Sequence, residues 1–288
     1  MNIGFIGLGH LGTPIAENLL EHHTGMMVYN RTISKAKLLE EKGAVVCESV
    51  KQLASACDII FTIVSNDDAL KQITDWEDGI AANLKPGGIH ISMSTVLPVT
   101  SNELFKLHQQ YENHYIACPV SGRPDAARNK QLNFIVSGSN EIINTIKPLL
   151  TNAGAAAIWE FGAEPGASNV AKLCTNYLIL GAIQSISEGI NLARKSGIDE
   201  AAWMNMMTAT LFNCGIYKSY GDIILKDTFH PVAFTLELGL KDATLINQQA
   251  ETAGASMPLA ALIKNEFEEL LKGGFGDFDW SALALSVK

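Results

Sequence analysis

The sequence predicts an α/β fold, in which a doubly wound, mainly parallel sheet is followed by an all-helical region. In the first half of the 288 residues, short apolar runs alternate with helical patterns, as in sheets whose strands are joined by helices. After about residue 163 the apolar runs give way to a helical pattern over residues 167–195, with further helices behind it. We therefore expect two domains, residues 1–162 and residues 163–288, the second built on a long inter-domain helix.

The strands are predicted from short apolar and β-branched runs that helical or polar segments separate. We expect them at Ile3–Ile6, Met26–Tyr29, Ala44–Val46, Ile59–Val64, Ile89–Ser92, Tyr115–Ala117, Phe134–Ser137 and Ala156–Trp159, with antiparallel edges allowed among the later ones. In the long helical pattern, Leu173, Leu180 and Ile183 share one face, and Gly197 ends it. Further helices are expected over residues 199–212, 216–226, 233–253 and 258–272.

Composition narrows the classes of protein. The net charge of −9 argues against a nucleic-acid or anionic-membrane surface, and no apolar stretch is long enough to span a bilayer. The N-terminal residues read as a strand of the fold with no basic segment before it, so we expect no signal peptide. The five cysteines are odd in number, widely spaced and without a C-x-x-C pair, which predicts reduced thiols in a cytoplasmic protein. The histidines lack ligand spacing, so we expect no metal.

The most informative motif is a glycine triplet, Gly7, Gly9 and Gly12, between a strand and a helix. In this context G-x-G-x-x-G predicts a dinucleotide-binding, Rossmann-type fold. The first glycine allows a tight turn, the second lets a pyrophosphate approach the backbone, and the third lets helix and strand pack closely. The intervening Leu8, His10 and Leu11 complete the loop that we expect to hold the pyrophosphate at the helix N-terminus.

The residues after the second strand indicate which dinucleotide binds. NAD-preferring folds usually have an acidic residue here for the ribose hydroxyl, whereas this chain has Asn30, Arg31 and Thr32. A guanidinium can pair with the 2′-phosphate of NADP through charge-assisted hydrogen bonds. We therefore favour NADP(H) over NAD(H). The alternative is that Arg31 is a solvated turn residue.

Further cofactor contacts are expected where two neighbouring strands end. Val64, Ser65 and Asn66 follow the fourth strand, and Thr95 follows the fifth. Small polar side chains at the carboxyl ends of parallel strands could meet the ribose or the nicotinamide. Each of these residues, taken alone, is also compatible with an ordinary loop.

One pair of residues offers proton-transfer chemistry. Lys172 and Asn176 lie four residues apart in the predicted long helix and therefore share a face. An ammonium beside an amide can give a proton to a developing alkoxide and hold its oxygen. Such a pair is usually a solvated helix face, but the apolar neighbours Val170, Ala171 and Leu173 argue against simple exposure.

Four motifs, in order along the chain, resemble the β-hydroxyacid dehydrogenase family, which includes 3-hydroxyisobutyrate dehydrogenase and the glyoxylate/succinic semialdehyde reductases. The first is the glycine segment from Gly4 to Leu19, and the second, Pro119–Gly122, resembles the family's substrate motif. The third, Gly166–Asn176, resembles its catalytic motif, and the fourth runs from Phe234 to Asp242. Similar members with an asparagine–arginine pair after the second strand use NADPH.

The resemblance implies a role for each matched residue. Lys172 would be the general acid/base and Asn176 would orient the same substrate oxygen. The substrate would be held by Ser121, Gly122 and Thr95, with Arg123 beside them. Burial in a cleft should lower the pKa of Lys172 toward neutral pH. The C-terminal motif would close over the cofactor with Phe234, Lys241 and Asp242.

The chain departs from the family pattern at four positions. Ala117 stands where aspartate is common, and Arg123 stands where a second glycine is common. Ser168 replaces a frequent glycine, and Thr175 a frequent first asparagine. Arg123 either grips a larger or more acidic substrate or turns outward to pair with Asp125, and the sequence leaves both open.

The sequence thus predicts an NADPH-dependent oxidoreductase that interconverts a small aldehyde or keto acid and its hydroxy acid by hydride transfer. Two alternatives remain. An imine reductase could use the same scaffold, although such relatives often replace the lysine. A non-catalytic NADP-binding regulator would not need Lys172, Asn176 and Lys241. The apolar character of the long helix predicts a homodimer or homotetramer formed through the helical domain.

Overall fold

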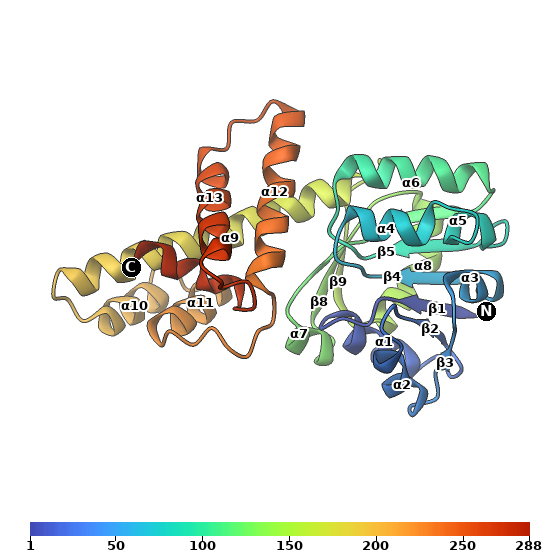
Figure 1. Cartoon of the computed structure of the whole chain (residues 1–288), viewed down its shortest axis with the longest axis horizontal. Helices are drawn as coiled ribbons and strands as arrows, with labels where there is room; N and C mark the ends of the chain where they lie inside the picture. The colour runs from blue at the N-terminus through green and yellow to red at the C-terminus, as the bar shows by residue number, and fades with distance from the viewer. The chain divides into compact units, whose positions relative to one another are not determined.

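The computed structural model describes all residues, 1–288, and these divide into two compact units, Met1–Lys172 and Leu173–Lys288. The first unit, called the sheet unit here, holds a six-stranded parallel sheet with the order β3-β2-β1-β4-β5-β6 (Figure 1). The order reverses between β1 and β4, and in such sheets ligands bind at the carboxyl ends of these two strands. The predicted doubly wound sheet is confirmed. Its strands are β1 (Ile3–Ile6), β2 (Met27–Tyr29), β3 (Val45–Val46), β4 (Ile59–Thr62), β5 (Ile89–Ser92) and β6 (His114–Ala117).

Helices cover both faces of this sheet because its strands are apolar on both sides. On one face, Ile15, Leu19 and Ile143 pack into one buried cluster with strand residues. On the other face, Leu53 and Ile80 pack with Ile60. The helices of the sheet unit are α1 (Gly12–Leu20), α2 (Ile33–Glu40), α3 (Val50–Ala56), α4 (Asp67–Thr74), α5 (Ile80–Asn83), α6 (Pro98–Gln110), α7 (Pro124–Arg128) and α8 (Asn140–Asn152).

The later strands form a separate small sheet with the order β7-β8-β9. Its members are β7 (Val120–Ser121), β8 (Leu132–Val136) and β9 (Ala155–Glu160), with β7 antiparallel to β8 and β8 parallel to β9. The sequence did not distinguish this small sheet from the main one, and the antiparallel pairing that it allowed among the later strands occurs between β7 and β8. After β6 the chain passes through Pro119, which has no N–H to donate to a neighbouring strand, and β7 then pairs with β8.

The second unit, called the helical unit, contains no strands. The long helix α9 (Ala167–Lys195) has the predicted bounds; its first six residues belong to the sheet unit and the rest to the helical unit. Gly254 ends α12 in the left-handed conformation with φ of 65°. The remaining elements are α10 (Glu200–Ala209), α11 (Gly215–Leu225), α12 (Leu236–Ala253), α13 (Pro258–Lys272) and the 3₁₀ helix η1 (Trp280–Val287), which the sequence did not predict.

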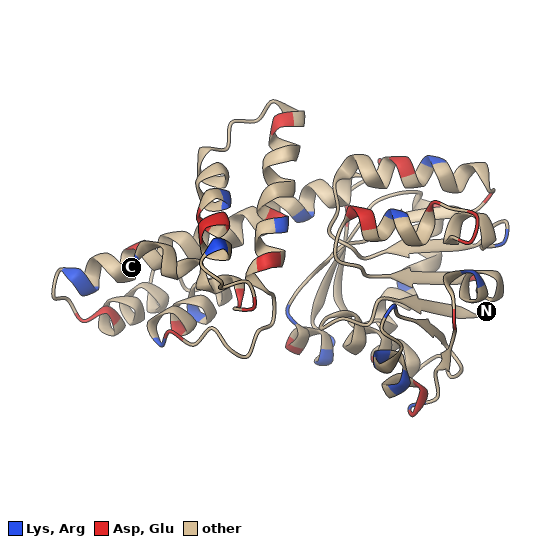
Figure 2. Cartoon of the chain, in the orientation of Figure 1, with Lys and Arg blue, Asp and Glu red and all other residues tan.

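No helix of the structure combines the length and apolarity needed to cross a membrane. All five cysteines are free thiols, of which Cys174 and Cys214 are exposed and the other three are buried. Acidic and basic residues are interspersed along the helices of both units (Figure 2). No group of three or more histidine, cysteine or acidic side chains is arranged to hold a metal ion.

A buried chain of hydrogen bonds crosses the sheet unit. Thr62 Oγ1 lies 2.9 Å from His90 Nε2, and His90 Nδ1 lies 3.0 Å from His108 Nε2. Asn113 Oδ1 lies 2.5 Å from His108 Nδ1 and completes the chain. Both histidines are fully buried. Burial lowers the pKa of His90 well below its ordinary value and that of His108 to about 4.

These histidines should make the stability of the sheet unit depend on pH. Both stay neutral in the folded state, whereas the unfolded chain protonates them below about pH 6.5. Stability is thus fully present above that pH and is lost as the pH falls toward 4. His108 alone should lower the free energy of unfolding by about 2 kcal/mol between pH 7 and pH 5. Urea unfolding of His108→Gln should show a weaker pH dependence than wild type. The exposed control His10→Gln should match wild type, and equal pH dependence in all three proteins would contradict the assignment.

Candidate active site

The glycine turn packs backbone directly on backbone. Gly7 has φ of 103°, and a Cβ there would lie 2.1 Å from the Ile63 carbonyl oxygen. A Cβ on Gly12 would lie 2.0 Å from the Gly7 carbonyl oxygen. No side chain fits at either position, so the start of α1 sits against the carboxyl ends of β1 and β4. A Cβ on Gly9, by contrast, would have no atom within 4 Å. Gly9 therefore has open space beside it, as the approach of a pyrophosphate requires.

Asn30 holds the glycine turn to the end of β2. Its Oδ1 accepts a hydrogen bond from the Leu8 amide at 2.9 Å, and its Nδ2 donates to the Thr32 carbonyl at 2.9 Å. Both ends of this side chain are thus occupied within the protein. Arg31 is exposed and forms no ion pair, so its guanidinium is available to an anionic ligand.

The loops after β4 and β5 are tied to each other by Ser94 and Asp67, which the sequence did not indicate as site residues. The Val64 amide donates to Ser94 Oγ at 2.9 Å. The Leu97 amide donates to Asp67 Oδ1 at 2.9 Å. Asn66 Oδ1 accepts from the Ala69 amide at 2.8 Å, which caps α4. The predicted cofactor contact at Asn66 thus has a structural role. Of the other candidates, Ser65 is exposed and Thr95 is half-buried.

The predicted lysine and serine come together in the sheet unit. Lys172, which is 8% exposed, donates from Nζ to Ser121 Oγ at 3.3 Å. The next residue, Gly122, has φ of 147°, and a Cβ there would lie 2.5 Å from Leu132 Cδ2, so the turn after Ser121 requires glycine.

Arg123 follows as the N-cap residue of α7 and is half-buried. Asp125, in the first turn of the same helix, is exposed. The two alternatives for Arg123, a grip on an acidic substrate and an outward pair with Asp125, both stay predictions.

A second cluster of predicted residues lies in the helical unit. Asn176 Nδ2 donates to Asp242 Oδ2 at 2.6 Å, and Lys241 Nζ lies 2.6 Å from Asp242 Oδ1. Asp242 is 1% exposed. A buried carboxylate needs partners for its charge. Here the Asn176 amide donates to one oxygen, and the Lys241 ammonium lies beside the other as an ion pair without hydrogen-bond geometry. The cluster thus fixes the amide of Asn176.

The backbone of Phe234, the remaining predicted residue, is held by Asp279, which the sequence analysis did not predict. Asp279 Oδ2 accepts from the amides of Ala233 at 3.1 Å and Phe234 at 3.3 Å. Asp279 Oδ1 caps η1 by accepting from the Ser281 amide at 3.1 Å. An aspartate two residues before a serine at the start of an apolar run is a helix N-terminus signal that could have revealed it.

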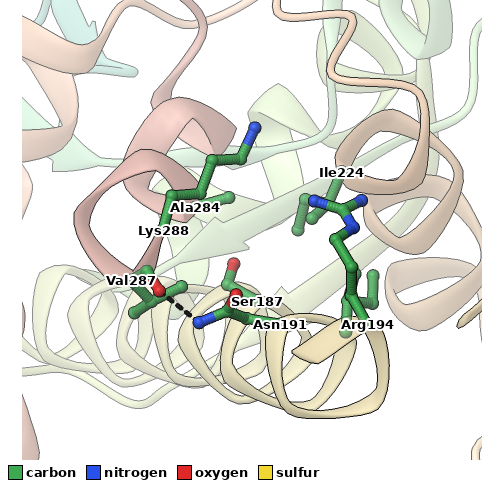
Figure 3. A pocket seen from close by; sticks show the side chains of 8 residues that line it. Ser187, Asn191, Arg194, Ile224, Ala284, Val287 and Lys288 are labelled. Atoms are coloured by element: carbon green, nitrogen blue, oxygen red, sulfur yellow. Dashed lines mark hydrogen bonds between the residues drawn. The ribbon is translucent and has the colours of Figure 1, made fainter. Parts of the chain in front are cut away.

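A small hollow elsewhere in the helical unit does not involve the predicted residues (Figure 3). It is lined by Ser187, Ile190, Asn191, Arg194, Ile224, Ala284, Val287 and Lys288. Asn191 donates across it to the Val287 carbonyl. Arg194 pairs with Glu200 at 3.0 Å. Its polar groups are thus engaged with other parts of the same unit.

The doubly wound sheet, its glycine turn and the all-helical second unit define a two-unit NAD(P)-dependent dehydrogenase. Residues 2–162 match the family model described as the NAD binding domain of 6-phosphogluconate dehydrogenase. Residues 166–286 match the model described as NAD-binding of NADP-dependent 3-hydroxyisobutyrate dehydrogenase. The chain belongs to the β-hydroxyacid dehydrogenase family and is an oxidoreductase of that family.

Relatives match over the full length of the chain. An uncharacterized oxidoreductase of Bacillus subtilis, YfjR, is 37% identical over 288 residues, which is 100% of both chains. Glyoxylate/succinic semialdehyde reductase 1 of Arabidopsis thaliana is 29% identical over 288 residues, covering 100% of this chain and 99% of the relative. The solved 3-hydroxyisobutyrate dehydrogenase of Mycobacterium tuberculosis has the same fold, with a TM-score of 0.89 at 24% identity, covering 100% and 99% of the two chains.

Two glycines of the turn should separate folding from cofactor binding. Gly12→Ala places a methyl group on the Gly7 carbonyl and should lower the free energy of unfolding by about 1–3 kcal/mol. Gly9→Val meets open space, so the melting temperature should stay near that of wild type. It should nevertheless raise the Kd for NADPH by roughly tenfold or more, because the side chain occupies the approach to the backbone. Thermal unfolding and fluorescence titration measure the two effects. Undiminished NADPH affinity in Gly9→Val would contradict the site.

Proposed function

We propose that this oxidoreductase uses NADPH to reduce a small aldehyde or keto acid to the hydroxy acid, with Lys172 as the general acid. The observation that carries the proposal is the buried Lys172 ammonium, 3.3 Å from Ser121 Oγ. When bound, NADPH supplies the hydride. Lys172 then gives a proton from Nζ to the developing alkoxide oxygen, and takes it back in the oxidation direction.

The surroundings of Lys172 suit this role. One of its contacts is the hydroxyl of Ser121, a neutral group that can also donate to a substrate carboxylate. The Ser121 hydroxyl and the tight turn at Gly122 offer donors for a substrate carboxylate, with Thr95 beside the cofactor end. Arg123 adds a guanidinium next to this turn. An anionic substrate such as a keto acid fits that set of groups best.

Asn176 is proposed to orient the substrate oxygen that Lys172 protonates. Asp242 accepts one hydrogen bond from the Asn176 amide, which fixes the side-chain rotamer and leaves its remaining polar groups for the substrate. The same carboxylate holds Lys241, so one buried acid sets two polar side chains of the family's third and fourth motifs. Lys241 and Phe234 are proposed to contact the cofactor.

We favour NADP(H) because of the way the residues after β2 are used. Both polar atoms of the Asn30 side chain form hydrogen bonds with the backbone. Arg31 is therefore the exposed charged side chain after β2 that could contact the ribose end of the cofactor. The model matched by residues 166–286 is described by an NADP-dependent enzyme, which supports the same choice. Glycine-turn residues Gly7, Leu8, Gly9, His10, Leu11 and Gly12 are proposed to hold the pyrophosphate.

The helical unit is proposed to form the homodimer or homotetramer contact. Leu178 and Leu192 on α9 and Leu211 after α10 are large apolar side chains that stay exposed in the single chain. Exposed apolar residues gathered on one unit are typical of subunit contacts. Analytical ultracentrifugation of wild type and of a Leu178→Glu, Leu192→Glu double variant tests this; a wild-type monomer would contradict it.

Replacing the proposed general acid should stop the reaction without affecting the cofactor. Lys172→Ala should lower kcat by at least a thousandfold while the Kd for NADPH stays within twofold of wild type, because the lysine acts on the substrate oxygen. Lys195→Ala removes an exposed lysine at the end of the same helix and serves as the matched control. Assays use NADPH oxidation with a panel of aldehydes, keto acids and imines. Turnover retained in Lys172→Ala removes the lysine from the mechanism. Turnover of imines alone supports the reductase alternative, and none with any substrate supports a regulator.

Cofactor choice should depend on Arg31. Arg31→Ala should weaken NADPH binding by about tenfold to a hundredfold, because a charge-assisted hydrogen bond contributes roughly 1.5–3 kcal/mol. NADH binding should be nearly unchanged. Lys42→Ala, which removes an exposed lysine paired with Glu17 at 2.7 Å, is the control. Titration of both cofactors measures the effect. An equal loss for NADH and NADPH would show that Arg31 does not read the 2′-phosphate.

A further inference from the structure

A pair of buried hydroxyl groups holds the first turn of α9 to the sheet unit. The Ser168 amide donates to Ser137 Oγ at 3.0 Å, and Ser168 Oγ donates to the Ala117 carbonyl at 3.1 Å. Ser137 Oγ lies 2.8 Å from Ser168 Oγ and donates to the Pro165 carbonyl at 2.7 Å. Both serines are fully buried. These bonds join residues that are 28 to 51 positions apart in sequence, so they fix tertiary position rather than helix formation.

The contact at Ser168 and the contact at Lys172 connect the same two segments. Ser168 and Lys172 are four residues apart, about one helical turn, and share a face of α9. Their partners, Ala117 and Ser121, are also four residues apart, on the chain that leaves β6 and enters β7. The two contacts are therefore successive cross-links between one helical turn and one extended segment. The first cross-link sets how far α9 stands from that segment where the second is made.

The other side of the same turn is tied to α6. Asn169 Oδ1 accepts from Ser101 Oγ at 2.8 Å, and Ser101 Oγ lies 3.2 Å from the Tyr115 hydroxyl. The Gly166 amide donates to Asn102 Oδ1 at 3.0 Å. A Cβ on Gly166 would lie 2.8 Å from the Pro98 carbonyl oxygen, so the helix begins in direct contact with α6. With both sides held, the turn can neither slide nor rotate freely.

We propose that Ser168 and Ser137 are positioning residues, which place the Lys172 ammonium against Ser121 and the substrate oxygen. The inference rests on the proposed role of Lys172 and adds what holds it there. The Lys172–Ser121 separation of 3.3 Å is near the long end of a hydrogen bond, so a small outward movement of α9 would break it. Misplacement of a catalytic group by about 1 Å can cost a hundredfold in rate.

Ser168→Ala removes the cross-link and leaves the helix sequence otherwise intact. We expect kcat to fall roughly tenfold to a hundredfold with little change in KM or in the Kd for NADPH. The solvent isotope effect on kcat should rise, because proton transfer from a displaced lysine becomes slower than the other steps. Ser187→Ala is the matched control. Ser187 is also a buried serine of α9, but its hydroxyl donates at 2.7 Å to Ile183 of its own helix. Its kcat and isotope effect should match wild type.

Ser137→Ala removes the partner of Ser168 after β8 and should show the same kinetic pattern. This second variant keeps the test available if Ser168→Ala folds poorly. A purely structural role predicts lower melting temperatures in both serine variants with kcat and the isotope effect unchanged, and that result overturns the proposal. The comparison with Lys172→Ala separates two failures. If Lys172→Ala is active, the proposed function fails. If Lys172→Ala is inactive while both serine variants keep wild-type kinetics, only the positioning role fails.

Discussion

The proposed cofactor half of the site depends on one close contact between backbones, at Gly7, Gly12 and the Ile63 carbonyl. Because a Cβ at Gly7 or Gly12 would lie within about 2 Å of a carbonyl oxygen, α1 can begin only where both residues are glycine. That contact brings the N-terminus of α1 to the point where the strand order reverses, between β1 and β4. A ligand phosphate placed there meets unpaired amides and the positive end of the helix dipole. Asn30 then holds the turn from the side of β2.

The proposed substrate half depends on a different constraint, which is that α9 starts inside the sheet unit. The first turn of α9 belongs to the sheet unit, where Ser168 and Asn169 bond to β6, to Ser137 after β8 and to α6. Lys172 and Ser121 therefore lie in the same unit, and the packing of that unit alone sets their separation. The cluster of Asn176, Lys241 and Asp242 is likewise complete within the helical unit. Each unit thus preorganises its own polar groups before any substrate is present.

Local signals in the sequence were enough to predict much of this arrangement. Apolar runs gave the six strands of the main sheet, the glycine triplet gave the turn, and the periodicity over residues 167–195 gave α9 with its observed bounds. The features that could not be predicted from the sequence depend on contacts between residues far apart in the chain. Ser137 and Ser94 are unremarkable in sequence, because their roles exist only after β8 and β5 are placed. The two-residue strand β7 is too short for any periodic signal, so the separate small sheet could not be foreseen.

The asparagine that stands after β2 in place of an acidic residue has a structural role of its own. The side-chain oxygen of Asn30 accepts a hydrogen bond from the Leu8 amide, and its nitrogen donates to the Thr32 carbonyl. A carboxylate could accept the first bond but has no hydrogen to donate to the second. The amide is therefore suited to holding the glycine turn to β2. In the proposed NADP(H) site, the neighbouring Arg31 is the exposed cation that would contact a 2′-phosphate.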